Sequence, residues 1–232
     1  MQKPVIRTID GRELTEGTDY DAEWPASSEN TGSYTVIVKG KGKYTGQTSA
    51  SYKINAKPVT PSVKLAAKSY TYNGKKKTPA VTVADGSTVL KKDRDYKVTY
   101  ASGRKNVGSY KVTVKLQGNY SGSGSAVFKI NPKGTKLGKL SGGSKSAMVN
   151  WTKQASKMAS SRITGYQIQF ATNSKFTRNK KTVNVSGYKT VSKEVTKLLG
   201  GKKYYVRIRT YKKIKNAKYY SAWSKAKTVK TV

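Results

Sequence analysis

The first 131 residues of this 232-residue chain contain one sequence module that occurs twice. Pro4, Asp10 and Gly11 recur 75 residues later, as Pro79, Asp85 and Gly86. Beyond Gly11 the offset is 76, so that residues 19–55 match residues 95–131 after one single-residue insertion. A repeat of this length is one structural unit. We therefore expect several small hydrophobic cores rather than one large core.

The second copy shows the alternation of apolar and polar residues that is typical of half-buried strands. This pattern runs through residues 96–100, 110–116 and 126–130. The dipeptides Asn73-Gly74 and Asp85-Gly86 are turn signals between such strands. Val, Ile, Thr and Tyr, which favour strands, far outnumber Leu in the whole chain. The sequence predicts an all-β protein.

The chain has no His and no Cys, which excludes catalytic triads, thiol nucleophiles, disulfides and imidazole or thiolate metal sites. Its 11 acidic residues are scattered over predicted turns and strand faces. We therefore expect no catalytic activity, no cofactor and no bound metal. No stretch approaches the roughly 18 apolar residues of a membrane span, and the residues before Trp24 form no signal peptide. We expect no membrane insertion.

The strand at Asp95-Tyr96, the Asn106-Val107-Gly108 turn and residues 118–122 resemble the bacterial immunoglobulin-like modules of large Gram-positive extracellular proteins. The resemblance covers both copies, residues 1–56 and 57–131. It implies tandem β-sandwich modules in a secreted or cell-surface protein. The first copy has no counterpart of residues 69–73, so it is predicted to be a truncated module with an unpaired sheet edge.

Residues 132–232 show a different strand pattern after the Pro132-Lys133-Gly134 break. Trp151 on the second predicted strand, and Leu198 six residues before Tyr204 with Gly201 between them, resemble a fibronectin type III domain. The resemblance implies that Tyr204 is the tyrosine-corner residue, whose phenol bonds to the upstream backbone. We call residues 132–232 the third domain.

Near the end of the chain, residues 220–224 read Tyr-Ser-Ala-Trp-Ser and are similar to the Trp-Ser-x-Trp-Ser motif of some fibronectin type III domains. In that motif aromatic rings interleave with arginines. The resemblance implies that Arg207 and Arg209 stack on Trp223 and Tyr220, at roughly 0.5–2 kcal/mol for each contact. We interpret these four residues as a structural ladder.

Positive charge increases along the sequence. The first 55 residues carry seven basic and seven acidic side chains, whereas the third domain has Glu194 as its one acid. A predicted hairpin in this domain concentrates basic and aromatic residues, namely Tyr211, Lys212, Lys213, Lys215, Lys218 and Tyr219. Lysines beside aromatic rings suit an anionic polysaccharide. The same residues would also serve as a soluble hairpin without a ligand.

The sequence predicts a non-catalytic extracellular stalk and adhesive region of a bacterial surface or secreted protein. Its expected partners are anionic cell-wall or host polysaccharides, with a host or cell-surface protein as a further partner. One alternative is a set of binding or spacer modules in a larger secreted enzyme. Another is a nucleic-acid-binding protein, which the pI of 10.2 favours. No helix-turn-helix, zinc or RNP motif is present, so we expect no specific nucleic acid.

Overall fold

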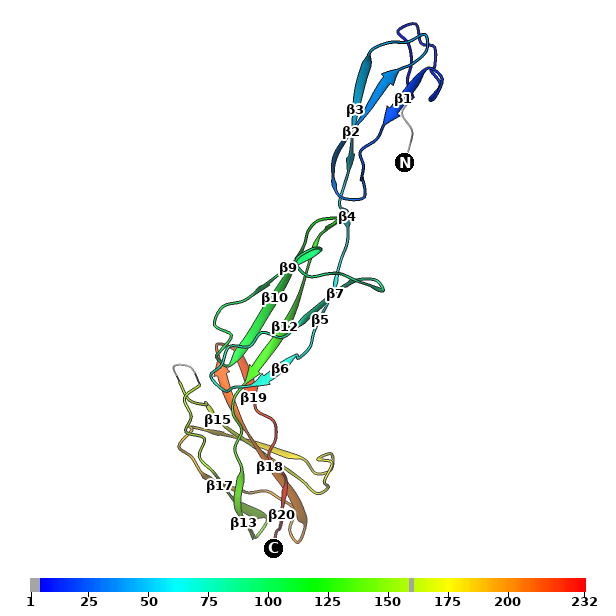
Figure 1. The fold of residues 1–232 in the computed structure, drawn as a ribbon. Coiled ribbons are helices and arrows are strands. Elements are labelled where there is room, and N and C mark those ends of the chain that lie inside the picture. Colours follow the sequence, from blue (N-terminus) through cyan, green and yellow to red (C-terminus); the bar gives the residue numbers. More distant parts are fainter. Residues whose placement is uncertain (1–4, 159–160) are drawn as a thin grey trace. The chain divides into compact units, whose positions relative to one another are not determined.

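A computed structural model describes residues 5–158 and 161–232 (Figure 1). In this part of the chain the regular elements are all strands, which confirms the predicted all-β class. The chain divides into two compact units. The first contains residues 1–62, 83–98 and 114–124, and the second contains residues 63–82, 99–113 and 125–232.

The first copy of the repeat forms a three-stranded antiparallel sheet. Its strands, in spatial order, are β1 (Tyr20–Glu23), β2 (Gly32–Gly40) and β3 (Gln47–Ile54). Inward residues alternate along β2, so that Val36 and Val38 are buried with Tyr20. Ile6 and Leu14, from the chain that precedes β1, pack on this small core. Within the described residues, β3 pairs with β2 alone.

The second copy repeats this sheet and adds a strand to it. The four strands, in spatial order, are β6 (Ser69–Thr71), β12 (Ser123–Asn131), β10 (Gly108–Leu116) and β9 (Tyr96–Tyr100). The added strand, β6, is parallel to β12. Alternation along β10 buries Val112 and Val114, and along β12 it buries Phe128 and Ile130.

Shorter strands complete the second copy. They are β4 (Lys57–Pro58), β5 (Ser62–Leu65), β7 (Val81–Asp85), β8 (Thr88–Val89) and β11 (Tyr120–Ser121). The carboxylate of Asp95, at the start of β9, accepts the Lys91 backbone N–H at 2.7 Å. The same carboxylate accepts Arg94 Nε at 2.7 Å and Arg94 Nη2 at 2.8 Å. Chiefly because of the Arg94 bonds, the pKa of Asp95 is lowered.

The third domain packs one sheet of three strands against one of five. The first sheet contains β13 (Leu137–Gly143), β14 (Ser146–Trp151) and β17 (Ser192–Val195). The second contains β15 (Gly165–Ala171), β16 (Lys181–Ser186), β18 (Lys203–Ile214), β19 (Ala217–Tyr220) and β20 (Lys227–Lys230). Trp151 and Tyr166 meet in the core with ring centroids 5.2 Å apart. The buried Tyr204 hydroxyl accepts the Leu199 N–H at 2.9 Å, an upstream backbone bond of the kind that a tyrosine corner makes.

Candidate functional site

The outward face of β18 carries a stack of alternating rings and arginines. The Arg207 guanidinium carbon lies 4.5 Å from the centroid of the Trp223 ring and 4.0 Å from that of Phe176. The Arg209 carbon lies 4.3 Å from the Trp223 centroid and 3.9 Å from that of Tyr220. We call these five residues the ladder. Each guanidinium is therefore held between two aromatic rings, a cation–π arrangement.

Two glutamines on β15 hold the ladder from the side. Gln169 Oε1 accepts Arg207 Nε at 2.9 Å and Arg207 Nη2 at 2.5 Å. Gln167 Oε1 accepts Arg209 Nε at 2.8 Å. Both glutamine amides then donate to side chains of β16, at Thr182 and at Asn184. Burial lowers the pKa of both arginines. Rings and amides thus hold these cations without a carboxylate.

Phe176 is the ladder residue that sequence reasoning missed. It lies in the segment between β15 and β16, with a φ of +57°. A positive φ is uncommon for a bulky residue, and no alternation pattern points to a residue outside a strand. Phe176 is buried, at 7% exposure. Its ring covers the face of Arg207 opposite Trp223, and so ends the ladder on that side.

The hairpin of β18 and β19 presents three exposed lysines: Lys213, Lys215 and Lys218. Lys213 and Lys218 are directly opposite each other in the antiparallel register. Lys215 lies in the two-residue turn, with a φ of +51°, a conformation that favours glycine. The Lys218 ammonium lies 5.4 Å from the Tyr211 ring centroid. The half-buried Tyr219 is opposite Lys212.

Two residues expected at this exposed hairpin surface are buried instead. Tyr211 and Lys212 are each only 5% exposed. The Lys212 ammonium donates to the carbonyls of Ser161 and Arg162, at 3.0 and 2.9 Å, and to Ser161 Oγ at 2.5 Å. Burial lowers the pKa of Lys212. Neither side chain is available to a ligand, because the strict alternation of β18 is lost where Thr210, Tyr211 and Lys212 are buried in succession.

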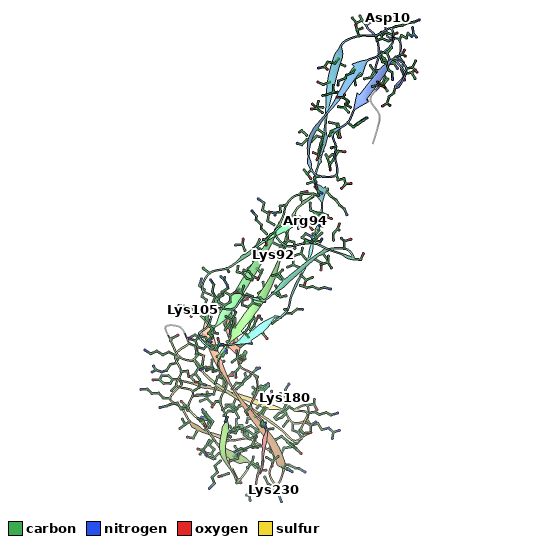
Figure 2. The ribbon with its side chains drawn as sticks, in the orientation of Figure 1. Asp10, Lys92, Arg94, Lys105, Lys180 and Lys230 are labelled. Atoms are coloured by element: carbon green, nitrogen blue, oxygen red, sulfur yellow. The ribbon has the colours of Figure 1, made fainter. Side chains whose placement is uncertain are left out.

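The basic charge of the third domain is not neutralised internally. The ion pairs found in the described part of the chain all lie between Arg7 and Asp95. Some lysines of the third domain donate to backbone carbonyls instead: Lys181 to Thr196 and Lys227 to Gly138. Many others extend from its surface, as Figure 2 shows for Lys180 and Lys230.

Other kinds of site were searched for across residues 5–158 and 161–232. No group of three or more acidic side chains there is arranged to hold a metal ion. No helix in those ranges is long and apolar enough to cross a bilayer. The surface of the third domain is therefore the strongest candidate, because it combines exposed cations with rings held in fixed positions.

Two domain families match the chain. The MBG domain family matches residues 61–134, and the fibronectin type III domain family matches residues 131–227. The chain therefore contains an MBG domain followed by a fibronectin type III domain. Both kinds of domain are non-catalytic structural modules and are typical of extracellular modular proteins. The MBG domain corresponds to the second copy of the repeat, which the sequence identified more broadly as immunoglobulin-like.

Several solved structures are similar to the chain. The chicken CNTN1 FN1-FN3 domains are 15% identical, with 94% of this chain and 92% of that chain covered and a TM-score of 0.36. Domains A168-A170 from titin are 17% identical, with 94% and 85% covered and a TM-score of 0.28. A myokine structure is 20% identical, with 42% and 90% covered and a TM-score of 0.31. No curated protein matches the chain.

Proposed function

We propose that this chain is a non-catalytic stalk and adhesive region of a Gram-positive bacterial surface or secreted protein, and that its fibronectin type III domain binds an anionic cell-wall or host polysaccharide. The contact residues are Lys213, Lys215 and Lys218, with Tyr219 beside them. One observation carries the proposal: three exposed lysines gather on one hairpin, two of them directly opposite each other, without an acidic partner in the described residues.

The hairpin accepts two local costs that a plain spacer has no reason to keep. Like charges at directly opposite positions, such as Lys213 and Lys218, destabilise a strand pair. A lysine in the left-handed region costs roughly 1–2 kcal/mol relative to an unstrained residue. A bound polyanion would relieve the repulsion between the lysines and would gain entropy from the release of its counterions.

The ladder supports the same proposal from below. It fixes β18 through Arg207 and Arg209, a few residues before the hairpin lysines. The Thr164 hydroxyl also accepts the Lys213 backbone N–H, at 2.9 Å. A rigid base lowers the entropy lost when the lysines engage a polymer. Tyr219 offers a partly exposed ring against which a sugar can pack.

The test is the salt dependence of binding by the full chain to two polymers, teichoic acid and dextran sulfate. Three phosphate or sulfate contacts predict that the logarithm of affinity falls with the logarithm of salt with a slope of about −2.7. The variant Lys213→Ser/Lys215→Ser/Lys218→Ser should lose most of this slope. The matched control, Lys175→Ser/Lys180→Ser/Lys189→Ser, removes the same charge from exposed positions of the same domain and should keep it.

Duplex DNA separates this function from general attraction to polyanions. Non-specific DNA binding is expected from the net charge of +36. If teichoic acid, dextran sulfate and DNA bound with the same affinity, and both triple variants weakened all three equally, the hairpin would not be a polysaccharide site. The domain would then be a spacer with a basic surface.

A further inference from the structure

The two copies of the repeat differ at one sheet edge. In the second copy, β6 lies parallel to β12, and Ser69, Tyr70 and Thr71 are opposite Lys129, Ile130 and Asn131. The Lys129 N–H donates to the Lys68 carbonyl at 3.0 Å, and the Asn131 carbonyl accepts the Tyr72 N–H at 2.8 Å. The equivalent strand of the first copy is β3, and within the described residues no strand occupies the edge that corresponds to β6.

The missing strand leaves part of the first copy uncovered. Phe128 and Ile130 of β12 are 0% exposed, and Tyr70 of β6 packs edge-on against Phe128 with ring centroids 5.8 Å apart. The equivalents of Phe128 and Ile130 in the first copy are Tyr52 and Ile54, which are only half-buried. The repeat therefore keeps apolar residues at these two positions in both copies, although only the second copy covers them fully.

Aromatic residues form a continuous surface next to this edge. Tyr52 stacks on Tyr34 with centroids 5.6 Å apart and an interplanar angle of 22°. Trp24 approaches Tyr52 at 6.1 Å and is 37% exposed. The Tyr52 hydroxyl is buried without a hydrogen-bond partner among the described residues. Buried hydroxyls usually have a partner, so this one marks a place that the first copy does not complete with its own groups.

We propose that the β3 edge, with the surface of Trp24, Tyr34 and Tyr52, binds an extended segment of another polypeptide, which adds to the sheet as a strand parallel to β3. The second copy shows the chemistry of that segment: an aromatic residue flanked by small hydroxyl residues, as in Ser69-Tyr70-Thr71. Backbone hydrogen bonds supply the affinity and the aromatic side chain the specificity. Lys53 N–H and the Asn55 carbonyl correspond to the bonding groups of Lys129 and Asn131.

Charge does not oppose this partner. The first copy carries as many acidic as basic side chains, in contrast to the strongly basic remainder of the chain. A segment that resembles residues 62–74, which includes Lys64 and Lys68, is therefore not repelled from the first copy. This inference is independent of the polysaccharide site, because it concerns a different domain and a neutral surface.

The test uses a fluorescent peptide with the sequence of residues 62–74 and the full chain, with anisotropy as the readout. The chain variant Lys53→Pro removes the N–H that corresponds to Lys129 N–H. This N–H points away from β2, so a proline is tolerated at this edge position. We expect the peptide to bind the Lys53→Pro chain at least tenfold more weakly. Lys53→Ala, which removes the charge and keeps the N–H, should bind within twofold of the original chain.

Two altered peptides test the same contacts without changing the protein. A peptide with Tyr70→Ser lacks the aromatic side chain, and one with an N-methyl group at Tyr72 cannot donate to the Asn55 carbonyl. Both should bind at least tenfold more weakly. Absence of binding at millimolar peptide would overturn the proposal. So would equal binding by the Lys53→Pro chain, since the peptide would then be exchanging into the second copy. Self-association of the chain that Lys53→Pro abolishes would show that a second copy is the occupant, which also contradicts the proposal.

Discussion

Replacement of Trp223 tests whether the ladder stabilises the fibronectin type III domain. Trp223 contacts both Arg207 and Arg209, at 4.5 and 4.3 Å. A cation–π contact contributes about 0.5–1 kcal/mol when exposed and about 2 kcal/mol when desolvated. Since both arginines are half-buried, about 1 kcal/mol for each contact is reasonable. Trp223→Leu should therefore cost about 2 kcal/mol, or roughly 8–16 °C in the melting temperature of a domain of this size.

The assay is calorimetry of the full chain, combined with a double-mutant cycle. Arg209→Lys keeps the charge and loses the flat face that contacts Trp223. If the two residues interact directly, the cost of the double variant should be smaller than the sum of the single costs by about 0.5–1.5 kcal/mol. Additive costs would show that the two side chains act independently. A fall of under about 2 °C for Trp223→Leu would refute the stabilising role of the ladder.

Three further changes have expected outcomes. Lys215→Gly should raise the free energy of unfolding by about 1 kcal/mol in denaturant titrations, because the φ of +51° suits glycine, while weakening dextran sulfate binding. The lowered pKa of Lys212 means that the unfolded chain binds more protons between the folded value and about 10.4, so stability should rise with pH in that interval, and Lys212→Met should abolish the rise. The lowered pKa of Asp95 contributes stability above about pH 3.9, which is lost as the pH falls through the folded pKa; Asp95→Asn should remove this acid dependence in melting curves.

Alternation of residue types is the part of this fold that a single sequence makes visible. It is sufficient to place Arg207 and Arg209 on the face of β18 opposite Val206 and Ile208. It could not reveal Phe176, because this ring reaches the ladder from outside any strand. It also misplaced Lys212. The carbonyls that accept its ammonium belong to Ser161 and Arg162, about fifty residues earlier, and a contact between such distant segments has no local signature.

The parallel pair of β6 and β12 also has a mechanical consequence for the second copy. These strands lie toward opposite ends of the copy in the sequence, so a pull along the chain loads their hydrogen bonds in shear and must break several at once. Within the described residues, the first copy has no such pair. Forced unfolding is governed by the unfolding rate. Under tension, the first copy should therefore yield first and lengthen the chain, which a single-molecule pulling experiment would register as separate force peaks for the two copies.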